Sequence, residues 1–169
     1  MGVTPEIEPI SAVFWAPVLS AFALNVSLYF YAQYKKDNGL VDIMWGILHI
    51  VPNLVVLCIN NNWNERTILT LSLISVWGIR LSIHIGVRHT GEEDYRYQAM
   101  RAKWEAKGKC SYYIAALMFV FVMQALFSLI ANCAALYICI YSSSEFYWLD
   151  IVGAAVFAFG FIFEAIADY

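Results

Sequence analysis

Apolar runs of about 20 residues constrain this chain more than any other feature of its sequence. A helix of that length crosses about 30 Å of hydrocarbon. The chain is 62% hydrophobic and only 14% charged, whereas soluble domains are about 45–50% apolar and about 25% charged. A soluble protein with five buried helices would need far more polar surface than this sequence offers. The sequence therefore predicts an all-α, multi-pass transmembrane helix bundle.

Five membrane spans are predicted within a single membrane domain, residues 10–169, that follows a polar tail of residues 1–9. The loop over residues 88–113 is amphipathic and basic, and a surface helix is expected in it from Tyr95 to Lys107. The expected spans cover about residues 10–31, 40–59, 67–87, 114–140 and 146–169.

The basic residues predict an orientation. Lys35 and Lys36 lie in the first loop, and six more of the ten lysines and arginines lie in loop 88–113. The positive-inside rule then places these loops and the C-terminus inside, and the N-terminus outside. No cleavable signal is visible, because the first basic residue is Lys35. The mitochondrial inner membrane and the endoplasmic reticulum are both compatible with this pattern.

Ionisable residues from three different spans are predicted to meet at the inner end of the bundle. Charges inside a membrane are costly, so they usually pair within the protein. Arg80 is expected to pair with Asp42 or Glu164. Such a cluster either holds the helices together or lines a pocket for an anionic ligand, since a guanidinium binds phosphate well. The members of the cluster are Asp42, Arg80, His84, Arg88, Glu164 and Asp168.

Several classes of site are not indicated. The net charge of −3 gives no reason to expect nucleic acid as a partner. His84 and His89 are five residues apart and lie on different helix faces, so no metal site is predicted. His49 is interpreted as a hydrogen-bonded core residue. Gly153 and Gly160 are interpreted as positions of close helix packing.

Four ordered blocks of sequence resemble a known family. They are Asn38-Gly-Leu-Val-Asp-Ile-Met-Trp-Gly46, Trp77-Gly-Ile-Arg-Leu81 followed by His84 and Arg88, Gly91-Glu-Glu-Asp-Tyr-Arg-Tyr97, and Phe163-Glu-Ala-Ile-Ala-Asp-Tyr169. The succession resembles the steroid 5-alpha-reductase-like membrane family, in its uncharacterised DUF1295 branch. That resemblance implies an oxidoreductase that uses NADPH to reduce a carbon–carbon double bond conjugated to a carbonyl in a sterol or other lipid.

The resemblance also implies roles for individual residues. Arg80, His84 and Arg88 are cofactor-binding candidates, the two arginines through the cofactor phosphates. Glu164 and Asp168 match an element that contacts the nicotinamide-nucleotide half. Asp42 stands where an acid would polarise the substrate carbonyl, and there it would have to donate a proton.

The sequence also departs from the family pattern. Family members continue past the Asp-Tyr pair with further helices and a His-Pro-Asn-Tyr-like element, whereas this sequence ends at Tyr169 and contains no His-Pro. The expectation is therefore a non-catalytic accessory subunit of a larger membrane complex, with lipids and other subunits as partners. The alternative is an NADPH-dependent lipid reductase, if the chain continues or a partner completes it. A small transporter or proton relay built on Asp42, His49 and Glu164 is a third reading.

Overall fold

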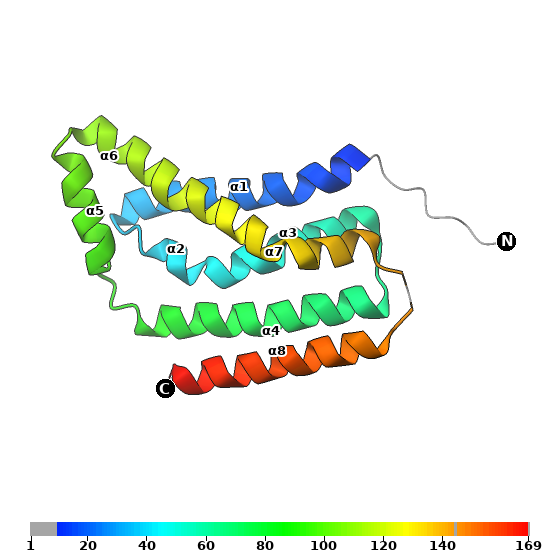
Figure 1. The fold of residues 1–169 in the computed structure, drawn as a ribbon. Coiled ribbons are helices and arrows are strands. Elements are labelled where there is room, and N and C mark those ends of the chain that lie inside the picture. The colour runs from blue at the N-terminus through cyan, green and yellow to red at the C-terminus, as the bar shows by residue number, and fades with distance from the viewer. Residues whose placement is uncertain (1–9, 144, 169) are drawn as a thin grey trace.

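The computed structural model describes residues 10–143 and 145–168, and all regular elements in this part of the chain are helical (Figure 1). The long helices run roughly side by side, and α5 lies across one end of the bundle. The elements are α1 (Ile10–Lys35), α2 (Leu40–Ile43), α3 (Trp45–Asn60), α4 (Glu65–Arg88), α5 (Tyr95–Glu105), α6 (Lys109–Ala116), the π-helical segment η1 (Leu117–Val122), α7 (Met123–Tyr141) and α8 (Trp148–Ala167).

Four helical stretches are long and apolar enough to cross a membrane: Ala12–Lys35, Glu65–Arg88, Lys109–Tyr141 and Trp148–Ala167. The predicted multi-pass helix bundle is therefore confirmed, and the protein is an integral membrane protein. The expected tail of residues 1–9 lies outside the described residues. The surface helix expected in the basic loop is present as α5.

The second expected span is not one continuous helix. The chain turns at Met44, which separates α2 from the 16-residue α3. A 16-residue helix is about 24 Å long, shorter than the hydrocarbon core. The described structure gives α3 other helices as neighbours, because it packs against α1, α4 and α7. Its polar residues His49 and Asn53 are buried in protein, which explains why a short, polar helix is stable at this position.

Two contacts fix α3 within the bundle. Gly46 on α3 faces Gly78 on α4 so closely that a methyl group on Gly46 would lie 2.0 Å from the Gly78 carbonyl oxygen. On another side, the Asn53 amide donates to Asn132 Oδ1 on α7 at 3.0 Å. Interhelical amide hydrogen bonds stabilise helix association in a bilayer, where no water competes for the same groups.

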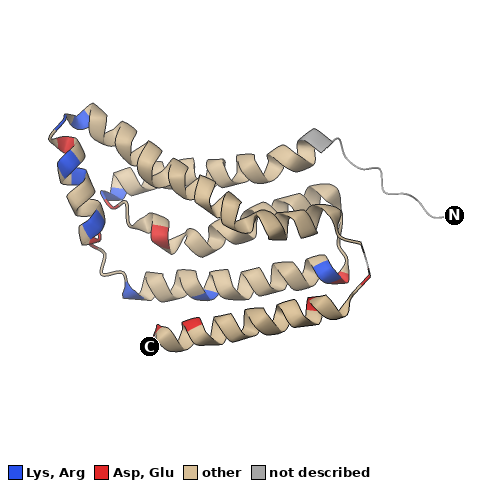
Figure 2. Cartoon of the chain, viewed as in Figure 1, with Lys and Arg blue, Asp and Glu red and all other residues tan. Residues whose placement is uncertain are grey.

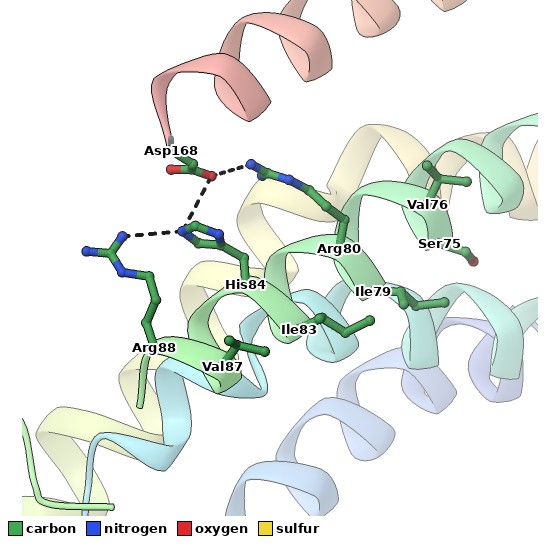
Figure 3. A pocket seen from close by; sticks show the side chains of 9 residues that line it. All are labelled: Ser75, Val76, Ile79, Arg80, Ile83, His84, Val87, Arg88 and Asp168. Atoms are coloured by element: carbon green, nitrogen blue, oxygen red, sulfur yellow. Dashed lines mark hydrogen bonds and ion pairs between the residues drawn. The ribbon is translucent and has the colours of Figure 1, made fainter. Parts of the chain in front are cut away.

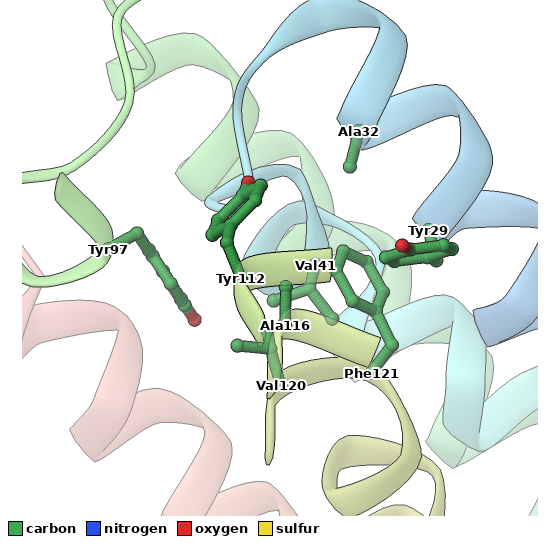
Figure 4. Close-up of a cluster of buried hydrophobic side chains, with 8 residues drawn as sticks. All are labelled: Tyr29, Ala32, Val41, Tyr97, Tyr112, Ala116, Val120 and Phe121. Atoms are coloured by element: carbon green, nitrogen blue, oxygen red, sulfur yellow. The ribbon is translucent and has the colours of Figure 1, made fainter. Parts of the chain in front are cut away.

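A hydrophobic cluster ties α5 to the end of the bundle (Figure 4). It joins side chains of α1, α2, α5, α6 and η1, so the basic loop is packed onto the spans rather than extended into solvent. The buried members are Tyr29, Ala32, Val41, Tyr97, Tyr112, Ala116, Val120 and Phe121. This packing positions the polar residues that follow α4.

Helix α8 lies at the edge of the bundle beside α4, and none of its described residues is buried (Figure 1). The prediction that Gly153 and Gly160 pack closely against another helix is wrong, because a methyl group at either position would meet no other helix within 4 Å in the described part of the chain. Polar contacts near the two ends of α8 hold it instead. One is the ion pair between Arg66 and Asp150, at 2.8 Å.

Candidate functional site

Arg80 joins α4 to the C-terminal end of α8 (Figure 3). Its Nη1 atom donates to Glu164 Oε1 at 2.6 Å, and its Nη2 atom donates to Asp168. The indole of Trp77, one turn earlier on α4, donates to the other Glu164 oxygen at 3.0 Å. Of the two expected partners of Arg80, Glu164 is therefore correct and Asp42 is wrong. The spacing of four residues puts Glu164 and Asp168 on one face of α8, where both reach one guanidinium.

A groove of about 820 Å³ lies along α4 beside the end of α8 (Figure 3). One side of it is apolar, with Ile79, Ile83 and Val87 exposed on the outer surface of α4. The other side carries ionisable groups. The residues that line the groove are Ser75, Val76, Ile79, Arg80, Ile83, His84, Val87, Arg88 and Asp168. A molecule in this groove meets hydrocarbon on one side and charge on the other.

Arg88 differs from the other arginines in its partner. Its Nη1 atom lies 3.3 Å from His84 Nε2 (Figure 3). Among the described residues, Arg88 is the only arginine without a carboxylate partner, because Arg66, Arg80, Arg96 and Arg101 each pair with one or two acids. The guanidinium of Arg88 is therefore available to an anion at no loss of an ion pair.

Asp42 occupies a second, polar pocket of about 260 Å³. It accepts hydrogen bonds from Tyr97 Oη at 2.8 Å and from Arg96 Nη2 at 3.1 Å. His84 and Arg88 line both this pocket and the groove, so the two cavities share a wall. The residues that line it are Gly39, Asp42, His84, Ile85, Arg88, His89, Asp94 and Arg96.

The charges around Asp42 shift the pKa values of their neighbours. Burial, reinforced by the nearby Asp42 carboxylate, raises the pKa of Tyr97. Its hydroxyl therefore keeps its proton and donates a hydrogen bond to Asp42. The side chain of Arg96 hydrogen-bonds Asp94 and holds the pKa of that carboxyl below its usual range.

A network that the sequence did not point to fixes the loop before α5. Glu93 accepts hydrogen bonds from the backbone and side-chain nitrogens of Asn38 and from two nitrogens of Arg101, all at 2.8–2.9 Å. Tyr112 joins the network through Asn38 at 3.1 Å. On the neighbouring turn, His89 Nε2 lies 2.8 Å from Asp37. In the sequence, the feature that could have pointed to this network is that Asn38 and Glu93 fall in two of the four blocks that carry the family resemblance.

His49 lies apart from this site. It is buried on α3, its Nδ1 atom lies 2.9 Å from the Trp45 carbonyl oxygen, and its ring meets the rings of Trp45 and Trp77 edge-on. The interpretation of His49 as a hydrogen-bonded core residue is confirmed.

The six candidates of the sequence thus fall into two joined groups. Arg80, His84, Arg88 and Asp168 line the groove, with Glu164 bonded to Arg80, and Asp42 faces the adjoining pocket. A family model described as "Protein of unknown function (DUF1295)" matches residues 28–169, which include all six. The chain belongs to the DUF1295 family. Neither curated proteins nor solved structures give a match. The DUF1295 match covers both cavities but names no activity.

Proposed function

We propose that this protein is a membrane reductase of the steroid 5-alpha-reductase type, which uses NADPH to reduce a conjugated double bond in a sterol or other lipid. The observation that carries the proposal is the pair of cavities that share His84 and Arg88. The groove suits a lipid, because its apolar side lies on the outer surface of α4. The polar pocket suits a phosphate-bearing group, because it is lined by charged residues. A reaction between a lipid and a charged cofactor needs these two environments side by side.

Of the two arginines expected to bind the phosphate of such a cofactor, only one is suited to it. Arg88 fits, because no described carboxylate neutralises it. Arg80 fits poorly in the phosphate-binding role that the family resemblance implies, because Glu164 and Asp168 already surround its guanidinium. Arg88, with His84 beside it, is therefore the residue that would hold the phosphate. When bound, the reduced nicotinamide supplies a hydride to the double bond.

Other residues shape the site. Glu164 and Asp168 hold Arg80 and thereby hold the end of α8 against α4, which keeps the groove in place. Asp42 accepts one hydrogen bond from the Tyr97 hydroxyl and one from Arg96. In this arrangement Asp42 accepts both hydrogen bonds, whereas the carbonyl-polarising role that the resemblance implies requires it to donate one.

The orientation of the protein is part of the proposal. Most lysines and arginines gather at the end of the bundle where α5 lies (Figure 2), and the positive-inside rule places that end inside. The polar pocket then opens towards the side where a water-soluble cofactor arrives. The membrane concerned is that of the endoplasmic reticulum or the inner membrane of the mitochondrion.

NADPH binding to the purified protein in detergent tests the proposal. Energy transfer from tryptophan to bound NADPH gives the affinity. Arg88→Ala should weaken binding about 10- to 100-fold, because one charge-assisted hydrogen bond contributes about 1.5–3 kcal/mol. Lys103→Ala removes the same charge from an exposed position on α5 and should leave the affinity unchanged. Equal affinities for the wild type and Arg88→Ala would refute the proposed cofactor site.

A second candidate function is a non-catalytic accessory subunit of a membrane complex. The exposed face of α8 favours it, because Phe159, Phe163 and Ile166 are each at least 69% exposed. A partner subunit could cover that face in place of lipid. Native mass spectrometry of the protein in mild detergent separates the two: a stoichiometric complex that binds no NADPH supports the subunit, and an NADPH-binding monomer excludes it.

A further inference from the structure

The contact between Arg88 and His84 depends on the protonation state of the histidine. An arginine side chain has only donors, so a hydrogen bond from Arg88 Nη1 requires a lone pair on His84 Nε2. When that hydrogen bond is made, the imidazole proton is on Nδ1 and the ring is neutral. The contact at 3.3 Å is therefore a hydrogen bond only while Nε2 carries no proton.

A second neighbour competes for the same nitrogen. Asp168 Oδ2 lies 3.9 Å from His84 Nε2 (Figure 3). A carboxylate is an acceptor, so this contact becomes a hydrogen bond only when Nε2 carries a proton. His84 Nε2 thus lies between one group that needs its lone pair and another that needs its proton.

The local charges favour the second state once Arg88 is taken away. Arg80, Glu164 and Asp168 together carry one positive and two negative charges, a net of −1. In the structure, the Arg88 guanidinium next to His84 balances that excess. An anion on Arg88 would remove this balance and add negative charge beside His84, and both effects favour a positive imidazolium. Among the described residues, the charged and titratable groups that line the two cavities with His84 are Arg80, Arg88, Asp168, Asp42, His89, Asp94 and Arg96, and Glu164 is paired with Arg80.

We propose that binding of an anion to Arg88 is coupled to uptake of one proton by His84, with Asp168 as the counter-charge. The inference rests on the proposed function, because it concerns the same phosphate site. It adds that the site loads an anionic ligand and a proton together. A reduction of a conjugated double bond consumes one proton along with a hydride. His84, which lines both cavities, would hold that proton between them.

The full-length protein in detergent tests the coupling with sulfate, a tetrahedral dianion that stays fully ionised from about pH 5 to about pH 8, where histidine titrates. Calorimetric titration in buffers of different ionisation enthalpy counts the protons taken up. The bound state holds more protons than the free state, so affinity should fall as pH rises, by up to about tenfold per pH unit. Wild type should take up close to one proton near the upper end of this range.

Two variants identify the groups involved. His84→Gln keeps an oxygen acceptor for Arg88 but cannot titrate, so sulfate should bind without proton uptake and with little pH dependence. Asp168→Asn removes the counter-charge and should reduce the uptake while sulfate still binds. Wild-type binding without proton uptake, or the same pH dependence in His84→Gln, overturns the coupling and leaves the NADPH site standing. Failure of sulfate to bind, or binding that survives Arg88→Ala, overturns the anion site and the coupling together.

Discussion

Gly46 of α3 and Gly78 of α4 meet backbone to backbone, and a methyl group on Gly46 would lie 2.0 Å from the Gly78 carbonyl oxygen. This contact brings α4, which carries Arg80, His84 and Arg88, directly against the most buried helix of the bundle. The position of the candidate site therefore depends on two residues that lie outside both of its cavities.

Gly46→Ala should destabilise the protein by about 1–3 kcal/mol, because the added methyl group forces two helix backbones apart. Gly153→Ala is the matched control: its methyl group meets none of the described neighbouring atoms within 4 Å, and alanine favours a helix over glycine by about 0.5–1 kcal/mol. Thermal unfolding in detergent measures both. Equal melting temperatures for wild type and Gly46→Ala would contradict the close crossing.

Glu93→Ala should destabilise the protein by about 3–5 kcal/mol, because it leaves Arg101 and Asn38 without their shared acceptor. The Glu93 side chain is only 6% exposed, so water cannot easily replace the lost bonds. Glu92→Ala removes the same charge from the exposed neighbouring position and should change stability by less than about 0.5 kcal/mol. Chemical denaturation of the two variants checks the difference, and similar midpoints would show that the network contributes little.

Tyr97→Phe should make the protein less sensitive to alkali. The folded-state pKa of Tyr97 is raised by burial and by Asp42, whereas an unfolded tyrosine titrates near pH 10. The contribution of the protonated hydroxyl is therefore fully present below about pH 10 and is lost as pH rises towards the folded-state pKa. Wild type should lose up to about 1.4 kcal/mol more stability per pH unit above pH 10 than Tyr97→Phe.

Denaturation midpoints at about pH 9 and about pH 11 provide the test. The comparison isolates one of eleven tyrosines, because the other ten titrate in both proteins. Parallel losses in the two proteins would mean that Tyr97 is ionised as readily in the fold as in the unfolded chain.

The membrane helices could be predicted because their signal is local. The apolar runs around α1, α4, α7 and α8 are long enough to span a bilayer wherever they lie in the sequence. Likewise, the spacing of Glu164 and Asp168 puts both on one face of α8, so their shared contact with Arg80 was partly foreseen. The predicted helix ends were less accurate. The third span was expected to begin at about residue 67, but α4 begins at Glu65 because Asn64 and Thr67 cap it reciprocally.

The partners within the site depend on contacts between segments far apart in the sequence. Asp42 pairs with Arg96, 54 residues away, because the cluster around Tyr97 packs α5 beside α2. Among the described residues, Arg88 is left without a carboxylate because Asp168 and Asp42 are taken by other arginines. Composition and helical periodicity by themselves determined that this protein is a bundle of membrane helices with charge at one end. Only the tertiary structure decided which charges neutralise one another, because that depends on which helix faces meet.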